Sequence, residues 1–99
     1  MLRKPGSSDP RRDNDYKKFR LQVLKRDGYR CQFPGCTSKS RLEVHHIIRW
    51  SDNKSLRYNT ANGITICRYH HKNYVTNHEK RYQYLFSSIA DKNSKKGKQ

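Results

Sequence analysis

The cysteine and histidine residues of this chain occur in pairs whose spacing suits a metal ion. Zinc is commonly bound by two such pairs, each separated by about two to four residues, because a turn can then bring both side chains to one ion. Cys31 and Cys36 form one pair, and Cys67 and His70 form the other. A disulfide among three cysteines leaves a spare thiol, whereas all three with His70 complete a four-ligand site. We predict that these four residues bind a structural zinc ion.

Three further histidines indicate a second metal site, because a tetrahedral zinc ion with four ligands cannot use them. His45 and His46 are adjacent within an apolar segment, and His71 directly follows His70. A buried imidazole needs a partner, and a charged one is more costly to bury. The alternative is that these imidazoles are simply packed or solvated.

The charge of the chain points to a polyanionic partner. Lys and Arg number 23 against 8 Asp and Glu, which gives a formal net charge of +15 spread along the whole chain. Such an excess repels itself unless a polyanion binds, and nucleic acid is the usual one. No stretch reaches the roughly 18 apolar residues that a membrane span needs. We expect a cytoplasmic protein with no membrane contact.

Composition divides the 99 residues into one domain with two polar ends. Residues 1–12 have the Pro, Gly and Ser content of a flexible basic arm, and residues 91–99 are predicted to be a disordered, Lys-rich tail. The domain is expected to span residues 13–90. With 31% hydrophobic residues its core must be thin, so a metal ion is expected to stabilise it.

Two helices are predicted to flank the metal-binding segment, from the helical spacing of their apolar residues. The first covers about residues 14–26, and Gly28 suits the position that follows a helix end. The second covers about residues 77–90, and Thr76 with Glu79 has the spacing of a capping box before it.

The segment between these helices is predicted to fold as strand, loop, strand and helix. The strands are expected at residues 42–48 and 63–67, where β-branched and aliphatic residues are concentrated. A helix at residues 68–75 would present His70 and His71 about 100° apart, so that each ring turns toward a different metal site.

Together these residues resemble the HNH endonuclease family. The likeness covers about residues 29–75 and is carried by the cysteine pair, the paired histidines at a hydrophobic strand, an asparagine five residues before the third cysteine, and a histidine just after the second zinc pair: Cys31, Cys36, His45, His46, Asn62, Cys67 and His71. It implies a small α+β fold with a ββα-metal (His-Me finger) core, stapled by structural zinc and flanked by the two helices.

The resemblance also implies roles for individual residues. His45 and His71 would bind a catalytic divalent ion, Mg²⁺, Mn²⁺ or Zn²⁺, and His46 would be the general base. Asn62 would tie down the loop and orient that base, although a turn before Gly63 would also explain it. The implied activity is phosphodiester hydrolysis of double-stranded DNA that leaves 5′-phosphate and 3′-hydroxyl ends.

The chain departs from the family pattern at several positions. His70 stands where relatives usually have cysteine, and Val75 stands where some have a third ligand for the catalytic ion. Glu43, on the strand face of His45, is a candidate to support or replace that ligand. Asn59 is an alternative to Asn62 in orienting the base.

Partner contacts and biological setting follow less directly. Phosphate contacts are predicted at Arg20, Arg49, Arg68 and Lys72. We expect a monomer that nicks one DNA strand per encounter, and dimerisation on DNA stays possible. The expected setting is a bacterial or phage-infected cell, where the protein would be a phage or mobile-element enzyme. The competing hypothesis is a zinc-stabilised module that binds nucleic acid without catalysis, which would have no need of His45, His46 and His71.

Overall fold

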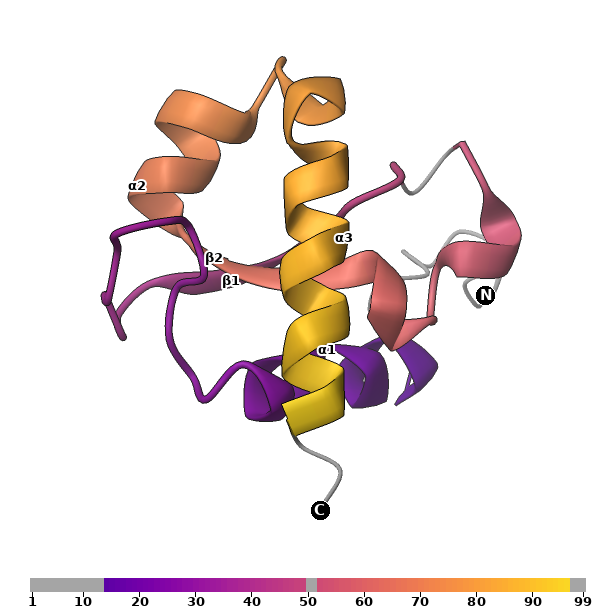
Figure 1. Cartoon of the computed structure of the whole chain (residues 1–99). Coiled ribbons are helices and arrows are strands. Elements are labelled where there is room, and N and C mark those ends of the chain that lie inside the picture. The colour runs from indigo at the N-terminus through magenta and orange to yellow at the C-terminus, as the bar shows by residue number, and fades with distance from the viewer. Residues whose placement is uncertain (1–13, 50–51, 97–99) are drawn as a thin grey trace, which may run out of the picture.

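The computed structural model describes residues 14–49 and 52–96, so the predicted arm at residues 1–12 lies outside the described part of the chain. The elements in chain order are α1 (Asn14–Arg26), β1 (Leu42–His46), the 3-10 turns η3 (Lys54–Leu56) and η4 (Thr60–Asn62), β2 (Gly63–Cys67), α2 (Arg68–His70), the π-helical turn η5 (His71–Val75) and α3 (Glu79–Lys96). This confirms the small α+β class (Figure 1). None of the helices in the described residues has the length and apolarity to cross a membrane.

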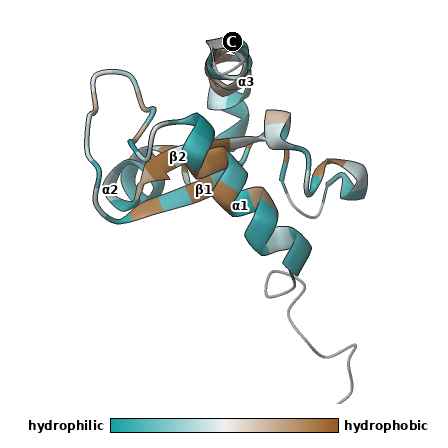
Figure 2. Cartoon of the chain, turned by 90° about the horizontal axis from the view of Figure 1, so that it is seen from below, coloured by the Kyte–Doolittle hydropathy of each residue, from teal (hydrophilic) through white to brown (hydrophobic). Residues whose placement is uncertain are grey.

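The two strands form an antiparallel hairpin between α1 and α3. β2 is buried along its whole length, and the hydrophobic residues gather on the strands and the helix faces that cover them (Figure 2). Ile64 and Ile66 belong to the apolar cluster that includes Phe86 and Ala90 of α3. Alternate residues of a strand point to opposite faces, so Gly63 faces α1.

Gly63 is required by the close approach of α1. A Cβ atom at this position would lie 2.8 Å from the Phe19 ring and 2.9 Å from Val23. The backbone of Gly63 is extended, with φ −121° and ψ 149°. Asn62 does lie in a turn before Gly63, the 3-10 turn η4, but the pair is not a two-residue Asn-Gly hairpin turn, because that turn needs positive φ.

The first helix ends as predicted, and Gly28 has the left-handed conformation, with φ 70°. Directly before it, Asp27 accepts hydrogen bonds from Arg26 at 2.8 and 3.0 Å and from the Thr65 backbone amide at 2.9 Å. Asn93 of α3 donates to the same carboxylate at 2.9 Å. This buried carboxylate thus joins α1, β2 and α3.

The last helix differs from the prediction at both ends. It begins at Glu79, whose carboxylate accepts from the Asn77 amide at 3.2 Å, while the Thr76 hydroxyl donates to the His71 carbonyl at 2.8 Å. The predicted cap at Thr76 is therefore wrong. The helix also continues to Lys96 instead of ending near residue 90.

Asn93 accounts for this extension. Its amide donates to Asp27 and to Gln32, both at 2.9 Å, and so fixes the helix end against the loop after α1. The prediction of a disordered tail is wrong for residues 91–96, while residues 97–99 lie outside the described part.

Candidate metal centre and active site

The predicted zinc ligands converge in the structure. The ligand atoms of Cys31, Cys36, Cys67 and His70 all lie within 4.8 Å of one another, and the cysteines form no disulfide. The Cys36 and Cys67 sulfurs are 4.0 Å apart, and the Cys67 sulfur is 3.3 Å from Nδ1 of His70. A tetrahedral zinc ion with Zn–S bonds of about 2.3 Å needs sulfurs roughly 3.8 Å apart, so the donor set fits that ion.

A tight turn shapes this cluster. The Cys36 amide donates to the Phe33 carbonyl at 2.9 Å, and Gly35 between them has φ 85°. The Phe33 amide points at the Cys31 sulfur, 3.4 Å away, which is the amide-to-thiolate contact expected of such a turn. The Phe33 ring stacks on His70 with ring centroids 4.3 Å apart. This stacking fixes the ligand that departs from the family pattern.

The thiols of the cluster differ in acidity. Burial raises the pKa of Cys31 to about 12, whereas the Ser38 backbone amide holds the pKa of Cys36 below its ordinary value. Metal ligation requires thiolates. An ion bound here would therefore displace the Cys31 proton, and the Cys36 thiol would give up its proton more easily than an ordinary cysteine.

His45 supplies a buried ring nitrogen that lacks a partner. The residue is 6% exposed, and its Nε2 has no hydrogen bond within the described residues. Burial, followed by the neighbouring His71, lowers the pKa of His45 to about 4. The ring is therefore neutral at pH 7, and its lone pair suits a metal ion. An unsatisfied buried polar group otherwise costs about 1–3 kcal/mol.

His71 faces His45 and is held by Glu43. The ring centroids of the two histidines are 5.2 Å apart, and Nδ1 of His71 is 2.6 Å from a Glu43 carboxylate oxygen. The carboxylate accepts this bond, so Nδ1 carries the proton, and in the neutral form of the ring Nε2 keeps a lone pair. A carboxylate commonly orients a metal-binding histidine in this way.

The two neighbouring imidazoles therefore have the donor chemistry of a divalent-ion site, in which Glu43 orients His71. Val75, where some relatives have a further ligand, is completely buried and has no donor atom. Across residues 14–49 and 52–96, the zinc cluster alone brings three or more Cys, His, Asp or Glu ligand atoms together. An ion held by His45 and His71 would thus have no third protein ligand of these types among the described residues.

His46 lies on the opposite face of the hairpin, against α1. Its ring stacks on Phe19 with centroids 4.9 Å apart, and its Nε2 is 2.8 Å from the Arg57 carbonyl oxygen. A carbonyl only accepts, so Nε2 carries the proton and Nδ1 is the basic nitrogen of the neutral ring. β1 ends at this residue, so the predicted strand at residues 42–48 is two residues too long.

Asn62 anchors the loop between the strands. Its side-chain oxygen accepts from the Ile48 amide at 2.8 Å, and its side-chain nitrogen donates to the carbonyls of Ile48 and Leu56 at 3.1 and 3.3 Å. Leu56 precedes Arg57, whose carbonyl contacts His46. Asn59 instead accepts from the Ala61 amide at 2.9 Å, as the cap of η4.

Comparison with protein families agrees with this geometry. Residues 30–76 match the family model of the HNH endonucleases. This segment belongs to the HNH endonuclease family. The matched HNH segment contains the zinc cluster, both strands and the histidines, and it excludes α1 and α3. No match was found among curated proteins or among solved structures.

The four cations predicted to contact phosphate differ in the groups that they contact. Arg20 donates to the Leu42 carbonyl at 3.4 Å, and Arg49 lies 3.6 Å from the exposed carboxylate of Asp52. Arg68 and Lys72 are exposed and line one groove with a third cation, Arg41.

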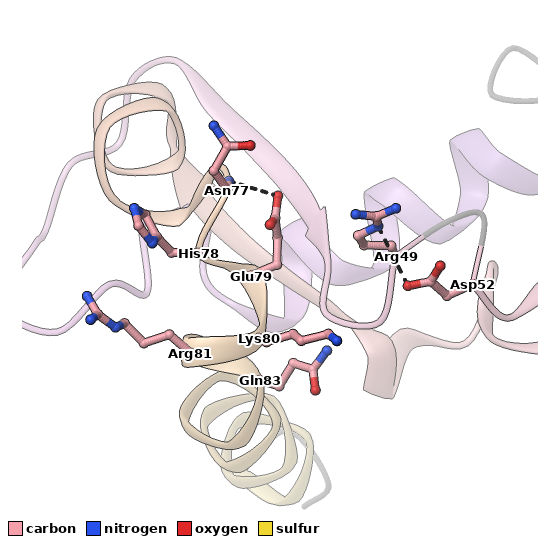
Figure 3. Close-up of a pocket in the computed structure, with 8 residues that line it drawn as sticks. All are labelled: Arg49, Asp52, Asn77, His78, Glu79, Lys80, Arg81 and Gln83. Carbon is pink, nitrogen blue, oxygen red and sulfur yellow. Dashed lines mark hydrogen bonds and ion pairs between the residues drawn. The ribbon is translucent and has the colours of Figure 1, made fainter.

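A cleft of about 480 Å³ lies between the loop after β1 and the start of α3. Figure 3 shows Glu79 of α3 facing this cleft, with Arg49 and Asp52 on its other side. Hydrogen bonds from its own backbone amide and that of Asn77, together with His45 and Arg49, hold the pKa of Glu79 below its usual value. The sequence showed Glu79 only as a helix cap and gave no sign that its charge acts on His45.

Proposed function

We propose that this HNH domain is a metal-dependent DNA endonuclease. The observation that carries the proposal is the buried, unpartnered Nε2 of His45 beside a His71 ring that Glu43 orients. A structural or purely binding role explains neither feature, because leaving that nitrogen unsatisfied costs stability. The family match supports nuclease activity in general.

In this proposal His45 and His71 hold a divalent ion at the end of β1. Such an ion stabilises the negative charge that builds on a phosphodiester and its leaving oxygen during hydrolysis. Glu43 keeps the proton of His71 on Nδ1 and so keeps Nε2 toward the ion. The scissile phosphate lies across the strand end, where it meets residues from both faces of the hairpin.

His46 is the proposed general base. Because Nε2–H donates to the Arg57 carbonyl, Nδ1 is the ring nitrogen that would take the proton from an attacking water molecule. Asn62 acts indirectly: its hydrogen bonds to the Ile48 and Leu56 carbonyls hold the loop that carries the Arg57 carbonyl. Attack by water with loss of the 3′ oxygen leaves 5′-phosphate and 3′-hydroxyl ends.

The Cys31, Cys36, Cys67 and His70 cluster is the proposed structural zinc site. It lies beside the small apolar cluster formed with α3 and supplies the cross-link that a thin core lacks. The net charge of +15 supports DNA as the polyanionic partner.

The deciding experiment is a cleavage assay on supercoiled plasmid with Mg²⁺, Mn²⁺ or Zn²⁺ added to zinc-loaded protein whose folding has been checked by circular dichroism. Strand scission that is lost in His45→Ala and His46→Ala, and kept in a His78→Ala control, is expected. Binding without scission by any ion would refute the nuclease and favour a non-catalytic binding module.

A further inference from the structure

The groove that contains Arg68 and Lys72 is unusually one-sided in charge. It encloses about 290 Å³ at the far end of the hairpin from His46. Its lining includes three exposed cations, two serine hydroxyls and a tyrosine that is 61% exposed: Arg41, Arg68, Lys72, Ser38, Ser40 and Tyr69. No Asp or Glu lines it.

The three cations are available to a ligand. Among residues 14–49 and 52–96, none of their side chains forms an ion pair or a hydrogen bond. The cleft at α3 provides the contrast, because Arg49 there is paired with Asp52 and Glu79 adds a second negative charge (Figure 3). The groove at Arg68 and Lys72, which no carboxylate lines, therefore suits an anion better than the cleft at α3 does.

The zinc cluster and the hairpin hold the walls of this groove in place. Leu42 pairs with Cys67 at the end of the sheet, and the Arg68 amide donates to the Arg41 carbonyl at 2.8 Å. The Cys31 amide donates to the Ser38 carbonyl at 2.8 Å, which fixes the other wall to a zinc ligand. The cations thus project from a cross-linked frame.

The groove is also within reach of the proposed active site. Arg41 precedes His45 by four residues, or about 14 Å at roughly 3.4 Å per residue of strand. Lys72 directly follows His71 in the chain. DNA carries a phosphate about every 3.4 Å along each strand axis, so a strand that follows β1 would meet the groove roughly four phosphates from the scissile one.

We propose that this groove binds backbone phosphate of the same DNA, on one side of the cleavage point, through Arg41, Arg68 and Lys72. The inference rests on the proposed function for the identity of the polyanion. The Ser38 hydroxyl already donates to the Ser40 carbonyl. The Ser40 and Tyr69 hydroxyls add hydrogen bonds to phosphate oxygens and read no base, so the groove positions the duplex without selecting its sequence.

The test measures binding of a labelled duplex by fluorescence anisotropy at several salt concentrations. Zinc-loaded protein is used in a His46→Ala background so that no strand is cut. Arg41→Gln, Arg68→Gln and Lys72→Gln should each make the slope of log K against log salt shallower by about 0.9, the value for one phosphate contact. Lys72→Arg, which keeps the charge, should keep the slope.

Arg81→Gln in the other cleft is the matched control, because it removes one exposed charge from a site with nearby carboxylates. Unchanged slopes in the three groove variants, with circular dichroism spectra like the parent, would overturn the proposal. An equal loss in Arg81→Gln would overturn it too, since net charge alone would then set the affinity. Plasmid cleavage by protein with His46 intact is scored separately, so failure of the nuclease and failure of the groove are distinguishable.

Discussion

Replacing Asp27 with alanine should remove a large part of the stability of the domain. The Asp27 side chain is fully buried, and its Arg26 partner is 9% exposed, with the two oxygens accepting at 2.8 and 3.0 Å. Removing one partner of a buried ion pair costs about 3–5 kcal/mol, because the other charge is left uncompensated. The Thr65 amide also loses its acceptor.

Two features decide where in that range the loss falls. Arg26 keeps its bonds to the Thr60 and Gly63 carbonyls, both at 2.7 Å, which limits the penalty. The orphaned Thr65 amide adds to it by about 1–3 kcal/mol. Since these contributions overlap, we expect a total of about 4 kcal/mol, against the 5–15 kcal/mol typical of folded domains.

Urea unfolding of the zinc-loaded protein, followed by circular dichroism, is the assay. With a denaturant slope of about 2 kcal/mol per molar, the midpoint should fall by roughly 2 M. Asp52→Ala is the matched control, because its pair with Arg49 is 3.6 Å long and more than half exposed, and such pairs contribute about 0–1 kcal/mol. A loss below about 1 kcal/mol for Asp27→Ala would refute the view that this carboxylate joins the helices to the hairpin.

Four further outcomes are expected. Removal of zinc by a strong chelator should unfold the domain, seen as loss of the cooperative melting transition; an unchanged melt after confirmed zinc loss would contradict this. His46→Ala should lower the cleavage rate by about 10²–10⁴ and leave DNA affinity nearly unchanged, whereas equal loss of both would mark the ring as structural. Gly63→Ala should lower the free energy of unfolding by about 1–3 kcal/mol, because the new Cβ would lie 2.8 Å from Phe19. Adding Phe19→Leu to that variant should restore part of the stability. A Gly63→Ala variant as stable as the parent would show that α1 moves aside easily. On supercoiled plasmid at limiting enzyme, nicked circles should precede linear DNA, because one site addresses one strand, and direct appearance of linear product would indicate an active dimer.

The Cys and His cluster and the two strands could be predicted because their determinants are local. The Cys31 and Cys36 spacing defines a turn, and the β-branched run at residues 63–67 defines a strand. The separation of His70 and His71 onto two sites follows from helical geometry, and the structure places one ring in the cluster and the other beside His45.

The remaining features depend on contacts between distant segments, which spacing along the chain does not reveal. Asn93 reaches Asp27 across 66 residues, and this contact extends α3 beyond its apolar repeat. Gly63 looked like part of a turn, although the ring of Phe19 is what excludes a side chain there. The effect of Glu79 on His45 likewise exists only once α3 is folded back over the hairpin.

The placement of the paired histidines on opposite faces of one thin hairpin gives the proposed nuclease two separate points of adjustment. Phe19 of α1 covers His46, and Phe86 of α3 lies 5.8 Å from His45, measured between ring centroids. Changes in α1 would alter the basicity and access of one ring, while changes in α3 would alter the polarity around the other. Natural or laboratory selection could therefore change the pH profile and the ion preference of the domain independently, because the backbone of β1 separates the two rings.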